Sequence, residues 1–403
     1  MSSPAPRFGD TPRDLHDLGA FLRTHSAEFR DAVHRDFFVR ELQARPLFPL
    51  AANAAHVDLA AALAWVFERA MSYGSLPHEV AERLSNLGRD HRRHGFPASA
   101  YDDFAAALVV GLRSFDLDPG LLLTAERTVR QVCATMAEAA RNADLAGTPP
   151  AHSAEVVDVA RPNRQTAVVH LTASLPIGYQ PGQSIPVTTP HTPGEWRLLT
   201  PAAPSDPTGQ LTFHLDEAGF VSRMMSHSRP GDRWIMGAPR GEFVRFPAVR
   251  LVFLCFGTGW AAVKPYLISL LDAVMQAKQS GTGDDPHFSV SVYHLAKSPG
   301  AHYDTHFQRN LAAVAPWIRI HHYVEETKDE VLLSPQPGAP VIFYPTSCLA
   351  SSALAGELLG SNFVLVGPEH HVAAARARLL DAQISPASIE AHPWSRGGRW
   401  PEV

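Results

Sequence analysis

The hydropathy pattern of the chain changes near residue 148, and this change constrains the fold more than any other feature. Over residues 11–143 apolar side chains recur at helical spacing, and 54–70 and 122–142 are long stretches without Gly or Pro. The segment 145–153, LAGTPPAHS, is small, polar and proline-bearing, as inter-domain linkers are. The sequence therefore predicts an all-helical first part that ends at a domain boundary.

Two different β patterns follow this linker. Short alternating or β-branched runs, separated by Pro and Gly, fill 154–243 and are typical of an antiparallel barrel. From 249 the runs RLVFLCF, FSVSVYHL, WIRIHHYV and NFVLVGP read as buried strands separated by helical segments. We expect a multidomain chain with an all-α domain over 1–148, an antiparallel β-barrel over 149–247 and an α/β parallel-sheet domain over 248–403.

Composition excludes several classes of function. The 403 residues carry 35 Lys and Arg against 40 Asp and Glu, with no basic arm, so a nucleic-acid partner is not expected. Apolar runs fall short of the roughly 20 residues that span a bilayer, and the first ten residues lack the apolar core of a signal peptide. Three cysteines without metal-ligand spacing predict neither a disulfide framework nor a thiolate site. We expect a cytoplasmic monomer without a membrane span, in which some of the 21 histidines are ligands or acid/base groups.

Two glycine turns indicate phosphate binding in the last domain. Gly257 and Gly259 follow an apolar strand directly and open a helix, where backbone N–H groups and the helix dipole can hold a phosphate. A tight turn is the alternative, because glycine serves any turn that needs positive φ. A later strand ends in Gly367 and Pro368 and also passes into a helix, so we expect the two turns to face one another across a sheet.

The order of short motifs between 154 and 394 resembles the ferredoxin-reductase module of flavohaemoglobins, in its divergent actinobacterial branch. The motifs are PGQ at 181–183, RLLT at 197–200, GFVS at 219–222, GAPRGEF at 237–243, GTG at 257–259 and VGP at 366–368. The resemblance implies FAD on the barrel and NADPH or NADH on the α/β layer. The residues implied to contact FAD are Gln183, Arg197, Thr200, Gly219, Ser222, His392 and Trp394.

The family assigns these positions specific roles. Arg197 would pair with the phosphate of the flavin nucleotide, and Trp394 would shield the flavin; a surface arginine is the alternative for Arg197. Leu199 and Ser184 stand where the family has flavin-packing tyrosines, so FAD must be seated differently. For the dinucleotide, the resemblance assigns Gly257, Thr258, Gly259, Gly367 and Pro368.

The choice between NADPH and NADH stays open. His294, Ala296 and Lys297 follow a strand where the resemblance places the adenosine ribose. Lys297 would favour NADPH if it bound a 2′-phosphate, and a solvated lysine is the alternative.

A flavohaemoglobin reductase implies a globin before it, and one segment matches the family's proximal-histidine pattern. His91 is followed by Gly95, Pro97 and Tyr101 at the family's offsets. The resemblance makes His91 the ligand of haem iron, with Tyr101 and Glu138 supporting it. His94 is the competing ligand, and a solvent-facing histidine is the alternative.

The distal side departs from the family. Phe48 matches the phenylalanine that packs on the porphyrin, but His34 stands where the family has a tyrosine that hydrogen-bonds iron-bound O2. His56 falls near the family's distal glutamine, with a solvent-facing helix position as the alternative. Asp90 and His392 replace a family lysine and glutamate placed between haem and flavin, so an Asp–His⁺ contact would replace the Lys–Glu one.

Together these features predict a flavohaemoprotein oxidoreductase. Electrons would pass from NAD(P)H through FAD to haem b, and the substrates would be O2 and nitric oxide, which is oxidised to nitrate. Two alternatives stay open. One is an FAD-dependent NAD(P)H oxidoreductase with a degenerate globin domain, and the other is a gas or redox sensor whose haem has two histidine ligands.

Overall fold

A computed structural model describes residues 12–42, 59–192, 195–217, 219–246, 249–281, 287–327, 342–345 and 360–394. The chain divides into two compact units, the first reaching Ala151 and the second beginning at His152. This division lies within the segment 145–153 that the sequence marks as a linker. Across the described ranges, no helix combines the length and apolar character that crossing a membrane requires.

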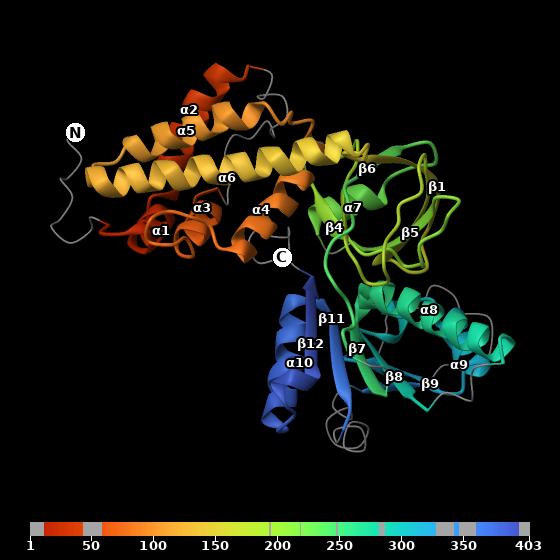
Figure 1. The fold of residues 1–403 in the computed structure, drawn as a ribbon. Coiled ribbons are helices and arrows are strands. Elements are labelled where there is room, and N and C mark those ends of the chain that lie inside the picture. Colours follow the sequence, from red (N-terminus) through yellow and green to blue (C-terminus); the bar gives the residue numbers. More distant parts are fainter. Residues whose placement is uncertain are drawn as a thin grey trace. The chain divides into compact units, whose positions relative to one another are not determined.

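Every regular element that the structure describes in the first unit is a helix, as the sequence predicts (Figure 1). Helix α6 begins where the Asp118 carboxylate caps it by accepting from the backbone N–H groups of Gly120 and Leu121. Buried apolar residues recur along α6 at helical spacing and face the core. The helices are α1 (Leu15–Thr24), α2 (Ser26–Arg40), α3 (Leu59–Phe67), α4 (His78–His91), the 3₁₀ turn η3 (Arg92–His94), α5 (Ala100–Arg113) and α6 (Pro119–Leu145).

Two glycines let helices of this unit approach closely. A Cβ on Gly88 of α4 would lie 2.4 Å from the carbonyl oxygen of Met136 on α6. A Cβ on Gly111 of α5 would lie 2.5 Å from the Val33 side chain on α2. Larger residues would separate these helix pairs. Gly88 therefore sets the distance between α4 and α6, and Gly111 sets the distance between α5 and α2.

The second unit contains two sheets, and the first is antiparallel. Its strand order is β4-β3-β6-β1-β2-β5, and a bridge between Pro201 and Phe213 joins the chain after β4 to β5. The sheet therefore forms a nearly closed barrel around buried Phe213 and Trp234. Its elements are β1 (His152–Ala160), β2 (Thr166–Ala173), β3 (Ile185–Thr188), β4 (Arg197–Leu199), β5 (Gln210–Asp216), α7 (Phe220–Ser226) and β6 (Arg233–Met236).

The second sheet is parallel throughout, with strand order β10-β9-β8-β7-β11-β12. The chain extends the sheet from β7 to β8 and β9 on one side and places β11 and β12 on the other, so the order reverses between β7 and β11. The elements are β7 (Arg250–Phe256), η4 (Gly257–Gly259), α8 (Trp260–Gln279), β8 (Ser289–Ala296), η5 (Pro299–Ala301), α9 (Thr305–Val314), β9 (Ile318–Val324), β10 (Phe343–Pro345), β11 (Asn362–Pro368), α10 (Glu369–Asp381), η8 (Pro386–Ser388) and β12 (Ile389–Trp394).

Candidate functional site

His91, the predicted iron ligand, is the last residue of α4 and is partly buried. Its Nδ1 lies 2.8 Å from the carbonyl oxygen of Leu87, one helical turn earlier, so the Nδ1–H donates to that carbonyl. This bond fixes the tautomer that carries the lone pair on Nε2, as in metal-bound histidines with a backbone acceptor. The competing ligand His94 lies in η3, with its ring centroid 5.9 Å from that of His91.

Arg92 anchors the end of α4 next to His91. Its side chain is almost fully buried, and Nη2 lies 2.6 Å from Asp144 Oδ1 and donates to the carbonyl oxygen of Thr148. Both partners lie at the end of α6 or just after it. The ion pair therefore fixes where α4 ends, and with it the position of His91.

Tyr101 is 2% exposed near the start of α5. Within the described ranges its hydroxyl has no hydrogen-bond partner. Burial raises the pKa of this hydroxyl, so it stays neutral and keeps a proton to donate. A buried polar group without a partner costs about 1–3 kcal/mol, so a partner from beyond the described residues is expected. The Tyr101 ring lies beside that of Phe96, at 5.9 Å, and Phe96 lies 5.7 Å from Phe37 of α2.

The remaining predicted residues of this unit divide into three cases. His34 is buried on α2, with its ring 5.2 Å from that of Phe38. Glu138 is exposed on α6 and makes no hydrogen bond or ion pair with any described residue, so the structure does not bring it to Tyr101. The reason is helix register, because the buried face of α6 passes through Cys133, Met136 and Ala140 and leaves position 138 toward solvent. Phe48 and His56 lie outside the described residues.

Gln183, a predicted FAD contact, fixes a turn just before β3. Its Nε2 donates to the carbonyl oxygen of Gly241 at 3.0 Å, and its Oε1 accepts from the backbone N–H of Gln180 at 2.9 Å. These residues border a groove of about 640 Å³ that Phe243 and Tyr266 also line. Gln183 therefore joins the PGQ turn to the GAPRGEF loop and helps to form one wall of the groove.

The two other barrel residues from the RLLT motif lie at β4. The Thr200 Oγ1 is 3.2 Å from the Ser184 Oγ, so Thr200 of the RLLT motif is hydrogen-bonded to Ser184, which stands where the resemblance expects a tyrosine. Arg197 is partly buried, and its Nη1 donates to the Trp196 carbonyl at 2.9 Å and to Glu195 Oε2 at 3.2 Å. The guanidinium is thus held in place by neighbours in sequence.

Gly219 and Ser222, the predicted pyrophosphate turn, are brought together at the start of α7. Gly219 has extended backbone and precedes the helix, and Ser222 Oγ lies 3.7 Å from the position of a Cβ on Gly219. Both residues therefore lie at the start of one helix of the barrel.

His392 and Trp394 end β12 among buried groups. The His392 ring is 4.9 Å from that of Phe243, and its Nε2 is 3.6 Å from Glu390 Oε2. Burial lowers the pKa of His392, and the Glu390 carboxylate opposes this. Glu390 is itself buried and accepts from the Arg245 backbone N–H at 3.1 Å. The indole N–H of Trp394 is buried and has no hydrogen-bond partner in the described part of the chain.

The two glycine turns of the parallel sheet lie side by side. A Cβ on Gly259 would lie 2.5 Å from the carbonyl oxygen of Val366, and one on Gly367 would lie 2.7 Å from Phe256 Cβ. Gly367 also has φ +144, a conformation that favours glycine. Both turns are at carboxyl ends of strands where the strand order reverses, the place where open α/β sheets bind ligands. Thr258 lies between the two glycines of the first turn, and Pro368 precedes α10.

Charged groups flank this switch point. Asp304 accepts from the Trp260 indole N–H and from Lys264 Nζ, both at 2.8 Å, which holds the first turns of α8. Lys297 is exposed, with its Nζ 3.8 Å from Glu326 Oε1. This exposed position is compatible both with binding a 2′-phosphate and with a solvated lysine.

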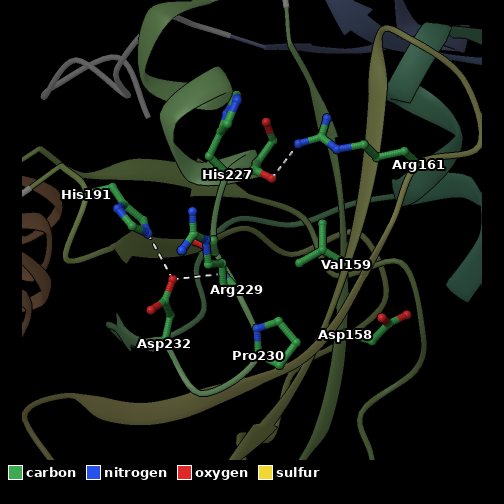
Figure 2. A pocket seen from close by; sticks show the side chains of 10 residues that line it. Asp158, Val159, Arg161, His191, His227, Arg229, Pro230 and Asp232 are labelled. Carbon is green, nitrogen blue, oxygen red and sulfur yellow. Dashed lines mark hydrogen bonds and ion pairs between the residues drawn. The ribbon is translucent and has the colours of Figure 1, made fainter.

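A second pocket, of about 620 Å³, lies on the barrel beside the end of α7 and was not expected from the sequence (Figure 2). His191 Nε2 donates to Asp232 Oδ2 at 2.9 Å, and the Arg229 backbone N–H donates to the same carboxylate. These bonds lower the pKa of Asp232. Arg161 donates to the Ser226 carbonyl at 2.9 Å. The lining residues come from three separate segments, so no local sequence pattern predicts this pocket.

The chain was compared with known proteins. No protein-family model and no curated protein matches it. A flavohaemoglobin from Malassezia yamatoensis, solved with bound FAD and haem, aligns with 94% of this chain and 97% of its own, with TM-score 0.62 and 16% identity. An Amycolatopsis cytochrome P450 reductase aligns with 60% of this chain and 69% of its own, with TM-score 0.50 and 21% identity. The chain shares the fold of these proteins over those lengths.

Proposed function

We propose that this chain is a flavohaemoprotein, an NAD(P)H-dependent oxidoreductase with FAD and a His91-ligated haem b, and that its reaction is the dioxygenation of nitric oxide to nitrate. One observation carries the proposal. A single chain joins an imidazole whose Nδ1–H is held by Leu87 to a parallel-sheet switch point bordered by Gly259 and Gly367. When bound, FAD supplies the change from two-electron to one-electron transfer, and haem supplies an iron that binds O2.

The residues of the first unit fit a haem. His91 offers a neutral imidazole nitrogen from a helix end that Arg92 holds in place. The buried hydroxyl of Tyr101 lacks an acceptor among the described residues, as expected where a bound group completes the site. The Leu87 carbonyl makes the imidazole more basic by accepting a hydrogen bond from its Nδ1–H, which strengthens coordination through Nε2.

The second unit fits FAD through groups that differ in part from the family pattern. Arg197 would pair with phosphate, and Gly219 and Ser222 would bind it at the start of α7. The buried Trp394 indole N–H is a donor that a bound flavin would satisfy. Because Ser184 stands in place of an expected tyrosine and is hydrogen-bonded to Thr200, polar groups would meet the ring edge there.

The dinucleotide would bind at the switch point. The backbone N–H groups of Thr258 and Gly259 lie at the start of α8, where they and the helix dipole attract phosphate. Gly367 keeps the second turn close to the first and free of a side chain, so the dinucleotide can approach the carboxyl ends of β7 and β11.

On the distal side, His34 would take the place of the family's tyrosine. Its side chain is buried on α2 next to Phe38, and an imidazole N–H there can donate a hydrogen bond to a bound ligand. The same residue would be the second ligand in the sensor alternative, so the proposal and its rival differ at this side chain.

The test compares His91→Ala with His94→Ala, a matched pair of histidines one turn apart. Haem and FAD per polypeptide are measured after reconstitution, followed by nitric oxide consumption with O2 and NADPH. We expect His91→Ala to lose haem and nitric oxide consumption while keeping FAD, and His94→Ala to keep all three. Loss of haem from His94→Ala alone would move the ligand to His94. A wild-type protein that takes up FAD and no haem would reject the proposal.

A further inference from the structure

Three buried imidazoles converge inside the second unit. His294 lies on β8, His302 follows η5 and His322 lies on β9, and all three side chains are at most 6% exposed. One ring nitrogen of each lies within 4.8 Å of those of the other two. Three histidines from separate segments meet here without a carboxylate or thiolate in the group.

Backbone carbonyls fix the tautomers of two of these imidazoles. His294 Nε2 lies 3.1 Å from the carbonyl oxygen of Gly257, and His302 Nε2 lies 3.0 Å from that of Tyr323. A carbonyl only accepts, so each Nε2 carries the proton and each Nδ1 carries the lone pair. Metal-binding histidines are held in this way, with one nitrogen bonded to a carbonyl and the other available to the ion.

Gln308 lies between two of the imidazoles and is fully buried. Its Nε2 is 3.2 Å from His294 Nδ1, and its Oε1 is 2.5 Å from His322 Nε2. The amide therefore bridges His294 and His322. Its oxygen is a neutral fourth donor that a tetrahedral ion could use after the amide turns.

The electrostatics suit a cation that binds neutral nitrogen ligands. Burial lowers the pKa of His294 to about 4 and that of His322 to about 3, and it holds the pKa of His302 well below its ordinary value. All three are thus neutral at physiological pH, the form that coordinates metals. The Asp304 carboxylate, which is itself paired with Lys264, opposes the effect of burial on the pKa of His294.

We propose that His294, His302 and His322 bind one Zn²⁺ ion next to the dinucleotide turn. An all-imidazole set selects zinc and its neighbours among transition metals over Ca²⁺ and Mg²⁺, which prefer oxygen. Zn–N distances of about 2.1 Å in a tetrahedral site hold the nitrogens about 3.4 Å apart, so nitrogens up to 4.8 Å apart must approach by as much as roughly 1.4 Å. The metal site itself does not depend on the function proposed above, whereas its coupling to a dinucleotide rests on that function.

The site would be coupled to the switch point through one hydrogen bond. His294 donates to the carbonyl oxygen of Gly257, the first residue of the turn, and Gly257 itself has φ +55. Fixing the His294 ring by a metal would fix this carbonyl as well. We therefore expect Zn²⁺ to tighten dinucleotide binding, and the dinucleotide to tighten Zn²⁺ binding by the same factor.

The test is a titration of the full-length, chelator-dialysed protein with Zn²⁺ against a chromophoric chelator. His302→Gln and His322→Gln are compared with His170→Gln, which removes an exposed histidine of the barrel by the same substitution. We expect one tight Zn²⁺ site in the wild-type protein and in His170→Gln. In His302→Gln and His322→Gln the Zn²⁺ affinity should fall at least about 100-fold. Equal binding in all four proteins, or no tight site in wild type, would overturn the proposal.

A second measurement covers the case in which the cluster variants do not fold. Zinc-edge X-ray absorption on the wild-type protein loaded with one equivalent of Zn²⁺ reports the ligands directly. We expect three imidazole nitrogens at about 2.0–2.1 Å. A shell made mainly of oxygen ligands would place the ion elsewhere on the surface and overturn the proposal.

Discussion

Replacing Gly259 by alanine tests whether the two glycine turns need to lie against each other. The backbone there has φ −52 and ψ −26, which any residue adopts, so Ala would by itself stabilise the start of α8 by about 0.5–1 kcal/mol. Its Cβ would, however, lie 2.5 Å from the Val366 carbonyl oxygen and 3.1 Å from the carbonyl carbon. Both obstacles are backbone atoms of β11, so they cannot rotate away, and such overpacking costs about 1–3 kcal/mol.

The expected net loss in the free energy of unfolding is therefore about 1–2 kcal/mol, which lowers Tm by roughly 2–4 °C per kcal/mol for a unit of this size. Relief of the clash moves the turn away from Gly367, so the dissociation constant for NADPH should rise about tenfold, equivalent to about 1.4 kcal/mol. Thermal unfolding and an NADPH titration of the full-length protein measure the two effects.

Gly281→Ala is the matched control. Gly281 has φ +68 with open space around it, and it lies outside both turns. Alanine there costs about 1–2 kcal/mol in backbone strain and should lower Tm without changing NADPH affinity. If Gly259→Ala leaves both Tm and the NADPH dissociation constant at wild-type values, the close packing of the two turns has no role in binding.

Three further results are expected. Asp90→Ala should slow electron transfer from flavin to haem in stopped-flow absorbance, and a wild-type rate would reject the expected contact between Asp90 and protonated His392. Arg92→Ala should lower the Tm of the first unit, since it removes the ion pair between the end of α4 and Asp144. An unchanged Tm and haem content would refute the anchoring role of Arg92. Burial lowers the pKa of His214, which hydrogen-bonds Tyr303, to about 3. The unfolded state therefore binds a proton at a higher pH than the folded state does, and the free energy of unfolding should fall as the pH drops below about 6.5. His214→Gln should flatten this dependence of Tm on pH, and an identical slope would count against it.

The regular elements could be predicted because their patterns are long and local. The helical spacing before 143 and the apolar run that became β7 each contain enough repeats to identify the element. The expectation that the GTG and VGP turns face one another is supported by the contacts of Gly259 with Val366 and of Gly367 with Phe256. Strand β12 was not predicted, because its six residues include a proline and few apolar side chains.

Other features depend on contacts that no local pattern contains. Glu138 matched a family position, but its exposure depends on the exact rotation of α6, which one sequence does not determine. His294, His302 and His322 are spread over three segments, so only the fold shows that they meet. The pocket beside α7 likewise combines segments that are distant in sequence.

The central claim is that one chain carries electrons from a nicotinamide dinucleotide to a His91-ligated haem, and an anaerobic absorption spectrum tests it most directly. The purified protein, reconstituted with FAD and haem, is measured before and after addition of NADPH and then NADH. We expect loss of the flavin bands together with a shift of the Soret band to the five-coordinate ferrous form. Flavin bleaching with no Soret response, or a six-coordinate ferrous spectrum with slow NADPH consumption, would contradict it.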